Sequence, residues 1–237
     1  MFQIEHISKS YGKKQILNDI SFVVPDGSAI GILGANGSGK STLLSCIAKK
    51  YSAGSKVRFG YVPQENPLFD ELKPIDNLRM WTNKKKPEIL SLLTTPPLCK
   101  LGIQNFLDTP VKNMSGGMKK RLQIAMVLAN KPQLLLMDEP FGPLDYATKV
   151  ELQLEVERIR LENPLTTFFV THDVEEATFV ADRIIMIEKG RIIEELKVDI
   201  PRPRPVEVRN SPEFHAISDY LLGKLLELSD VKVGGDA

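Results

Sequence analysis

The segment GANGSGKS (34–41) matches the pattern G-x-x-x-x-G-K-[ST], between an apolar run and a stretch of helical composition. Glycines let successive backbone N–H groups converge on a phosphate, and the helix that follows adds its partial positive charge. Lys40 can reach the β- and γ-phosphates, and Ser41 can offer its hydroxyl to Mg²⁺. The alternative is a glycine turn with a solvated lysine. The pattern predicts a nucleoside triphosphate site made by Gly34, Ala35, Asn36, Gly37, Ser38, Gly39, Lys40, Ser41 and Thr42.

A second candidate element is LLLMDEP (134–140), in which an apolar run leads into two carboxylates. The run indicates a central strand, and its carboxyl end would deliver Asp138 beside the phosphate site, as open α/β sheets usually do. We expect Asp138 to hold Mg²⁺ through water and Glu139 to orient or deprotonate the attacking water. General-base catalysis of this kind typically contributes about 10²–10⁴-fold. The alternative is two surface carboxylates at a strand end.

The segment NMSGGMKKR (113–121) puts two glycines and three cations in front of LQIAMVLAN, which has the composition of a helix. The first turn of a helix favours Asp and Glu, because the N-terminal end of the macrodipole is positive. The cations at 119–121 oppose that field, and an anion docked at the helix end would resolve the conflict. We therefore expect Ser115, Gly116 and Gly117 to bind an anion.

The elements that must position these residues alternate between strand and helix patterns. The helical pattern of STLLSCIAKK (41–50) follows the first glycine segment, and residues 65–128 have few strand signals and apolar spacings of three or four. Strands alternating with helices imply a doubly wound, parallel α/β sheet with a helical insert. The expected strands are FQIEHIS, QILNDISFVV, SAIGIL, VRFGYVPQ, QLLLMD, TTFFVT, RIIMIE and a last one after Gly190.

The carboxyl-terminal part contains DIPRPRPVEVR (199–209), which has the composition of a polyproline-II linker, followed by a helix pattern. Ser211 is the expected N-cap, with Pro212 at the first helical position. The helix has one apolar face and a polar face that is not markedly basic, so we expect it to pack on the domain rather than on a membrane. That face consists of Phe214, Ile217, Leu221 and Leu225.

The composition is that of an ordinary globular protein of 237 residues, 42% hydrophobic and 26% charged. Lys plus Arg (31) nearly balances Asp plus Glu (30), so no global field favours nucleic acid, and no nucleic-acid partner is expected. Cys46 and Cys99 have no metal-type spacing and fit a reducing compartment. Since about 18 or more apolar residues never run together, a membrane role would have to come through a partner.

Taken together, these motifs form an ordered set that resembles the ATP-binding-cassette (ABC) ATPases over residues 1–200. The resemblance implies an α/β P-loop NTPase with a RecA-like core, a small antiparallel β subdomain and an inserted α-helical subdomain. One domain would span 1–237, with the core at 1–64 and 129–200, the helical subdomain at 65–128, and a linker and helix at 201–237. The set consists of Tyr11 in SKSYGKK, GANGSGKS, Gln64 in YVPQE, SGG at 115–117, MDEP, LD at 144–145 and His172 in VTHD.

The resemblance assigns roles to the weaker motifs. Tyr11 would stack on adenine. Gln64 would contact Mg²⁺, beside Ser41 and Asp138, and would lie in the loop that faces a membrane partner. Asp145 would lie at a dimer seam near the hydrolytic site, and His172 would contact the γ-phosphate and hold the catalytic geometry.

The resemblance also implies partners. Ser115, Gly116 and Gly117 would bind the γ-phosphate of ATP held by a second copy of the chain, so that ATP closes the pair and hydrolysis releases it. The expected assembly also has two membrane-spanning permease subunits and an extracytoplasmic solute-binding protein. The chain would then lie peripherally on the cytoplasmic side of the cell membrane.

Some residues depart from the family pattern. The usual LSGGQ reads MSGGM here, so Met118 cannot make the amide hydrogen bonds of Gln, and Pro143 replaces a small residue beside LD. The stretch from Lys40 to Gln64 is short, so a trimmed antiparallel subdomain is expected.

The solute class rests on the finer resemblance. MDEPFGPLD, VTHDVEEATFVADRI and DIPRPRP resemble the ATP-binding subunits of nitrate, sulfonate, taurine and thiamine-precursor importers, whereas PQENPLFDEL and MSGGMKKRL resemble exporter-type subunits. We favour the importer. A soluble ABC ATPase of translation or DNA repair would commonly carry two cassettes or long coiled-coil insertions. A small-molecule P-loop kinase would leave SGG and the VTHD histidine unexplained.

Overall fold

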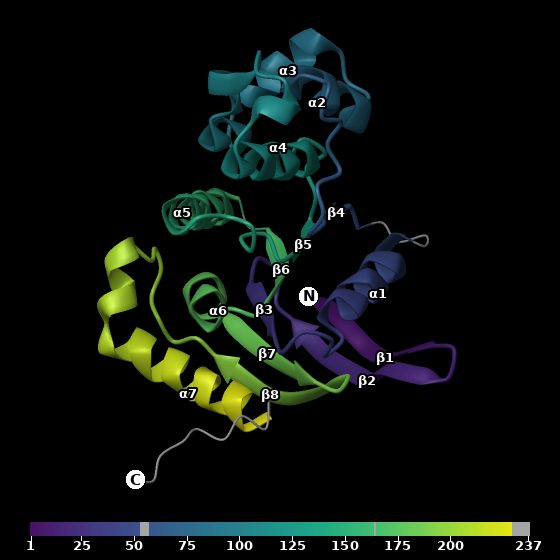
Figure 1. Cartoon of the computed structure of the whole chain (residues 1–237), viewed down its shortest axis with the longest axis vertical. Helices are drawn as coiled ribbons and strands as arrows, with labels where there is room; N and C mark the ends of the chain where they lie inside the picture. The colour runs from purple at the N-terminus through teal and green to yellow at the C-terminus, as the bar shows by residue number, and fades with distance from the viewer. Residues whose placement is uncertain (53–56, 164, 229–237) are drawn as a thin grey trace.

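The fold is built on one six-stranded sheet, seen in the computed structural model, which describes residues 1–52, 57–163 and 165–228 (Figure 1). All neighbouring strands are parallel except the last pair, β7 and β8. Every residue of β3, β5 and β6 is buried, because helices cover both faces of the parallel part. The order is β4 (Phe59–Val62), β5 (Leu134–Asp138), β6 (Thr166–Thr171), β3 (Ala29–Leu33), β7 (Arg183–Glu188) and β8 (Arg191–Lys197).

A separate two-stranded antiparallel sheet, β1 (Phe2–Tyr11) and β2 (Lys14–Val24), lies beside α1 (Lys40–Ser52) (Figure 1). Its buried side chains share a hydrophobic core with the apolar face of α1 and with one face of the main sheet. This is the small antiparallel subdomain expected from the sequence. Residues 53–56, part of the shortened stretch, lie outside the described residues.

The helical insert lies between β4 and β5 in the sequence and forms the upper part of the molecule in Figure 1. Its buried side chains, such as Leu78, Ile89 and Ile124, belong to the same core cluster as the face of the main sheet opposite α1. The helices are α2 (Pro74–Thr82), α3 (Lys86–Leu93) and α4 (Gly116–Leu128), joined by the 3-10 turns η1 (Leu98–Leu101), η2 (Ile103–Phe106) and η3 (Val111–Asn113).

The other helices are α5 (Tyr146–Glu162), α6 (Val174–Val180), η4 (Val206–Asn210) and α7 (Pro212–Leu228). Ser211 Oγ accepts a hydrogen bond from Phe214 N at 3.2 Å, as expected for an N-cap. Phe214 and Leu221 are buried, so α7 packs on the domain, as predicted. Within the described residues, no helix is long and apolar enough to cross a bilayer. Residues 229–237 of the expected carboxyl-terminal segment lie outside them.

The DIPRPRP tract is more than the linker that its composition indicated. Arg204 is only 2% exposed, and its guanidinium donates hydrogen bonds of 2.7–3.4 Å to five backbone carbonyls. Three of these carbonyls lie at the carboxyl-terminal end of α6, where a helix leaves acceptors without partners. The arginine therefore caps α6 and fixes the tract that leads to α7. The carbonyls belong to Thr178, Phe179, Ala181, Val198 and Ile200.

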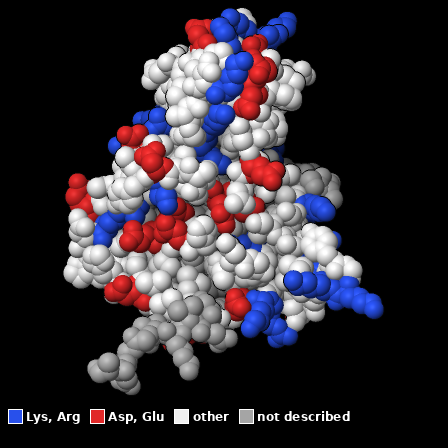
Figure 2. Space-filling view, viewed as in Figure 1, with Lys and Arg blue, Asp and Glu red and all other residues white. Residues whose placement is uncertain are grey.

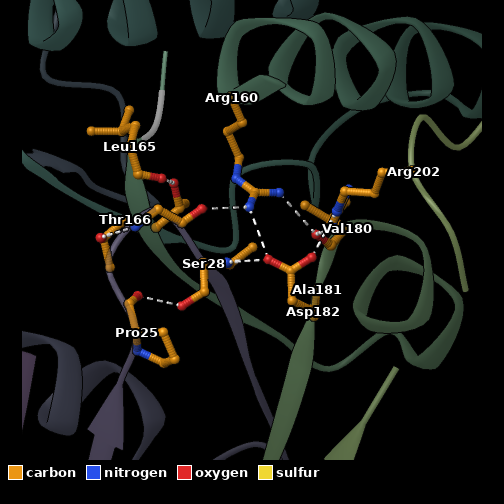
Figure 3. A network of polar contacts seen from close by, with 12 residues as sticks. Pro25, Ser28, Arg160, Leu165, Thr166, Val180, Ala181, Asp182 and Arg202 are labelled. Atoms are coloured by element: carbon orange, nitrogen blue, oxygen red, sulfur yellow. Dashed lines mark hydrogen bonds and ion pairs between the residues drawn. The ribbon is translucent and has the colours of Figure 1, made fainter. Parts of the chain in front are cut away.

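Arg202 joins a second polar network, centred on Asp182 (Figure 3). Asp182 Oδ1 accepts from Arg202 Nε at 2.7 Å, and Oδ2 accepts from Arg160 Nη2 at 3.0 Å and from Ala29 N at 2.7 Å. Burial would raise the pKa of Asp182, but the arginine charges and the Ala29 N–H outweigh it and lower the pKa. The network thereby ties the carboxyl-terminal tract and α5 to the first residue of β3, the strand that leads into the phosphate-binding segment.

Candidate nucleotide-binding and catalytic site

The phosphate-binding segment (34–41) turns from the carboxyl end of β3 into α1. A Cβ on Gly34 would lie 2.3 Å from the carbonyl oxygen of Ile187, so no larger residue fits against β7. Gly39 has a φ of +109°, and a Cβ there would lie 2.9 Å from Leu17. These two glycines are therefore required by the packing of the segment as well as by the approach of a phosphate.

Lys40 is buried at the start of α1, and its ammonium lies inside the segment that precedes it. Nζ donates to the carbonyl oxygens of Gly34 and Ala35 at 2.8 and 2.9 Å. Burial lowers the pKa of Lys40, although the charges of Glu139 and Asp138 partly oppose the shift. The segment thus presents a desolvated cation and a helix N-terminus to the same space, which suits a polyphosphate.

Asp138 lies at the carboxyl end of β5 beside α1, with 4% of its surface exposed. Its Oδ1 accepts from Ser41 Oγ at 3.0 Å and its Oδ2 from Tyr61 OH at 3.3 Å. Burial and the charge of Glu139 raise the pKa of Asp138, against the two hydrogen bonds that lower it. A carboxylate and a hydroxyl at this separation fit Mg²⁺, which takes few protein oxygens and completes its shell with water and phosphate.

Tyr61 is a site residue that the sequence did not reveal. It pairs with Leu136 across β4 and β5, two residues before Asp138, so both side chains lie on one face of the sheet. Burial and the neighbouring carboxylate raise the pKa of Tyr61 to about 12. The hydroxyl therefore stays protonated and donates a hydrogen bond to Asp138. The alternation was present in the sequence, but the strand order that makes β4 the neighbour of β5 was not.

Glu139 is held between two side chains from other elements. Gln64 Nε2 donates to Oε2 at 3.1 Å, and His172 Nδ1 lies 3.3 Å from Oε1. The backbone of Glu139 has a φ of +42°, in the left-handed region that non-glycine residues rarely adopt, and its N–H donates to Val170 O at 3.1 Å. This turn points the side chain of Glu139 in a different direction from that of Asp138, as the sequence suggested. Three expected site residues, Gln64, Glu139 and His172, are in contact here.

A cavity of about 480 Å³ opens over the phosphate-binding segment. Tyr11 lies at its rim, at the end of β1, with 59% of its surface exposed, so a nucleobase can stack on its ring. Lys14 and Ile16 of β2 also line it, and nothing in their local sequence indicated this. The other lining residues are Asn36, Gly37, Gly39, Lys40, Ser41, Thr42, Gln64 and Glu139.

The SGG segment lies at the N-terminus of α4. Ser115 is the N-cap, and its Oγ accepts from Met118 N at 3.2 Å, while Ser115 and Gly116 are both exposed. A Cβ on Gly117 would lie 2.4 Å from Cγ2 of Thr148, so α4 and the first turn of α5 are in close contact. Asp145 caps that first turn by accepting from Thr148 N at 3.1 Å.

The SGG segment and Asp145 therefore share one exposed region. Among the described residues that line the 480 Å³ cavity, none comes from SGG or from Asp145. The site residues thus fall into two groups, one around the chain's own phosphate-binding segment and one on the surface formed by α4 and α5.

The argument from the cations at 119–121 was wrong, because each has a partner in this chain. Lys119 pairs with Asp70 at 3.3 Å, and Arg121 pairs with Glu151 and Glu155 at 3.1 and 2.9 Å. Lys120 is 3% exposed and donates to Pro63 O at 3.3 Å. These partners lie tens of residues away in the sequence, so the local pattern could not show them. The exposed helix end at Ser115 remains open to an anion.

Comparison with known proteins agrees with this geometry. The ABC transporter family model matches residues 17–142, more than half of the chain. The aliphatic sulfonates import ATP-binding protein SsuB of Pectobacterium atrosepticum is 36% identical over 219 residues, covering 85% of this chain and 79% of the relative. SsuB 2 of Pseudomonas fluorescens is 33% identical over 239 residues, covering 95% and 86%.

Two further similarities extend the comparison. The sulfate/thiosulfate import ATP-binding protein CysA of Salmonella typhi is 36% identical over 212 residues, covering 80% of this chain and 58% of CysA. A solved dimeric bacterial ABC transporter cassette has a TM-score of 0.71 at 24% identity, covering 85% of this chain and 100% of that one, and shows the same fold. The chain belongs to the ABC transporter family and is an ATP-binding ATPase of that family.

Proposed function

We propose that this chain is the ATP-hydrolysing subunit of an importer for a small oxyanion, of the sulfonate or sulfate type. The position of Glu139, between Gln64 and His172 and next to the buried Asp138–Ser41 pair, is the observation that carries the ATPase mechanism. The relatives supply the direction and the solute class, since they are named as import proteins for aliphatic sulfonates or for sulfate and thiosulfate. The exporter alternative has no comparable support.

The roles proposed for the residues follow from their contacts. Tyr11 stacks on adenine, the backbone of 34–41 and Lys40 hold the phosphates, and Ser41, Asp138 and Gln64 hold Mg²⁺. When bound, Mg²⁺ neutralises charge on the β- and γ-phosphates.

Glu139 then accepts the proton of the attacking water. Oε1 of Glu139 faces His172, which holds the carboxylate in place and contacts the γ-phosphate. Figure 2 shows Lys and Arg side chains gathered where Figure 1 places the tip of the β1–β2 hairpin. Lys9, Lys13 and Lys14 lie within three residues of Tyr11 in this hairpin, where they favour the approach of a polyanion.

Two copies of the chain complete each site. Ser115, Gly116 and Asp145 are exposed and lie outside the cavity of their own chain, with the buried Gly117 directly beneath in α4, so this region is available to nucleotide held by a second copy. Attraction at an exposed helix end contributes only about 0.3–1 kcal/mol, so closure needs contacts from both copies at once. The solved cassettes of the same fold are described as dimeric, one of them with ADP and Pi.

A second cavity, of about 520 Å³, suits the membrane partner. It lies between β4 and the helical insert, and its rim carries Met80 and Trp81, which are 60% and 47% exposed. Tyr61 and Pro63 also line it, so a permease subunit seated there would contact the residues next to Asp138 and Gln64. We place two permease subunits on the two copies, at the cytoplasmic face of the membrane, with a solute-binding protein on the other side.

Reconstitution of the full transporter tests this assignment. The chain is combined in liposomes with candidate permease subunits and a candidate solute-binding protein from the same organism. ATP hydrolysis and uptake of labelled ethanesulfonate are then measured with and without the binding protein. We expect uptake that requires both ATP and the binding protein. Extrusion of solute without any binding protein would support the exporter instead.

A further inference from the structure

Lys149 is a charged residue of α5 that the proposed mechanism does not use. It lies one helical turn after Asp145, and its N–H donates to Asp145 O at 2.9 Å, which forms the first hydrogen bond of the helix. Its side chain is 20% exposed and reaches away from α4 toward the segment after β6. There Nζ lies 3.2 Å from Asp173 Oδ2 and 2.7 Å from Glu176 Oε1.

These two carboxylates hold the backbone on both sides of His172. Asp173 caps α6 by accepting from Glu176 N at 3.1 Å, and its own N–H donates to Thr171 Oγ1 at 3.0 Å. Thr171 Oγ1 in turn donates to Glu176 Oε2 at 2.6 Å. Thr171, before the histidine, is therefore bonded to Glu176, and Asp173, after it, is itself the other carboxylate that Lys149 binds.

Lys149 and His172 also line one cavity of about 440 Å³, below the exposed Tyr146. A continuous path thus runs from Asp145 to Lys149 and its two carboxylates, along the chain from Asp173 to His172, and finally to Glu139. The buried apolar side chains of α5 already anchor this helix on the domain, so the ion pairs of Lys149 are not required for that purpose.

We propose that Lys149 is a positioning residue that couples the Leu144–Asp145 segment to His172, so that closure of the pair sets the imidazole against Glu139. This inference rests on the proposed function, because it assigns Asp145 to the seam between two copies. When a second copy presses on Asp145, the first turn of α5 moves and Lys149 carries the movement to Asp173 and Glu176. Active-site displacements of about 1 Å can cost about 10²-fold in rate.

The burial of the partners supports a specific role for the lysine. The side chain of Glu176 is only 4% exposed, and burial raises its pKa, while hydrogen bonds from Lys149 and Thr171 oppose that shift. Burial would lower the pKa of Lys149, but Glu176 and Asp173 outweigh it and raise the pKa. The ion pair therefore favours the charged form of Lys149 and offsets part of the cost of burying Glu176, and a neutral residue at 149 would leave Glu176 to take up a proton or move.

The test compares four variants of the full chain in Mg-ATP hydrolysis, ATP binding and thermal unfolding. Lys149→Met removes the bridge, and Lys149→Arg keeps it. The double variant Lys149→Met/Glu176→Gln removes the bridge without leaving a buried charge unpaired, and Gln still accepts from Thr171. Lys100→Met is the matched control, because Lys100 pairs with Glu162 at 3.0 Å at the other end of α5.

We expect Lys149→Met and the double variant to lose about 10- to 100-fold in kcat with KM and ATP affinity unchanged. Lys149→Arg should recover most of the rate, and Lys100→Met should match the wild type. A double variant that regains both stability and kcat would overturn the inference, since the lysine would then be only a structural counter-ion. A wild-type chain without hydrolysis would instead contradict the proposed function.

Discussion

The imidazole Nδ1 of His172 lies 3.3 Å from Oε1 of Glu139, although the two residues follow different strands. Because β5 and β6 are parallel neighbours, their carboxyl ends meet at one edge of the sheet and bring the two side chains together. The other oxygen of Glu139 accepts from Gln64, so the carboxylate has a partner on each side and a fixed orientation. A carboxylate held in this way needs little rearrangement to act as the base that we propose it to be.

Replacement of this base gives the most direct prediction. Glu139→Gln should lower the rate of phosphate release by at least 10²-fold, because the amide cannot accept the proton of the attacking water. ATP should still bind, and pairs of chains should accumulate, as measured by light scattering after gel filtration in Mg-ATP. Glu162→Gln, at the far end of α5, is the control. Normal turnover in Glu139→Gln would show that another group is the base.

The in-trans role of the SGG segment predicts a different phenotype. Ser115→Arg should leave ATP binding by a single chain intact, because Ser115 does not line its own nucleotide cavity. The bulky cation should prevent closure of the pair and block turnover. Equilibrium binding of a fluorescent ATP analogue and phosphate release measure the two effects separately. Loss of binding at concentrations where the chain is monomeric would contradict the role.

The buried Lys120 predicts a pH-dependent stability. Burial lowers its pKa from 10.5 to about 8, so between these values the unfolded chain binds more protons than the folded one. Stability should therefore rise with pH from about 8 to 10.5, and below pH 8 the buried ammonium costs about 3 kcal/mol.

Lys120→Met should remove this cost. In urea titrations, the variant should be more stable than the wild type at pH 7, with an advantage that shrinks as the pH approaches 10.5. Lys100→Met, at a half-exposed ion pair, should show no such trend. An equal difference at all pH values would mean that burial does not shift the pKa of Lys120.

The arginine that caps α6 predicts a large loss of stability on substitution. Arg204→Met would leave five buried carbonyls without this donor, and each buried acceptor left unsatisfied typically costs about 1–3 kcal/mol, so we expect a loss of several kcal/mol. Urea titration measures the change in the free energy of unfolding. Lys197→Met, at an exposed residue of β8, is the control and should change it by less than about 0.5 kcal/mol. A similar small change in Arg204→Met would mean that the tract is the simple linker its composition indicated.

The parts of the fold that the sequence predicted well are those with a strong local pattern. The run TTFFVT coincides with β6, and RIIMIE coincides with β7, because strands buried on both faces read as continuous apolar runs. The 3-10 turns between α3 and α4 were not foreseen, since they follow no apolar period. The fold class was confirmed because the motifs fix the order of strands and helices around the phosphate-binding segment.

The candidate site divides in the same way. Lys40, Ser41, Asp138 and Glu139 could be predicted because each stands in a short motif whose spacing carries the chemistry, and they lie close together in the structure. Tyr61 and Lys149 were missed because their partners, Asp138 and Glu176, are distant in the sequence. The cations at 119–121 were misread for the same reason, because their partners come from distant segments.

The contact between Gly117 and Thr148 also limits how the molecule can be recombined. With space for no more than a hydrogen atom on Gly117, α4 and the start of α5 form a single unit, although β5 separates them in the chain. A chimaera that takes its helical insert from a relative must therefore take the first turn of α5 from that relative as well. A graft that ended at Leu128 would pack the α4 of one protein against the α5 of the other, and the two helix surfaces would not match.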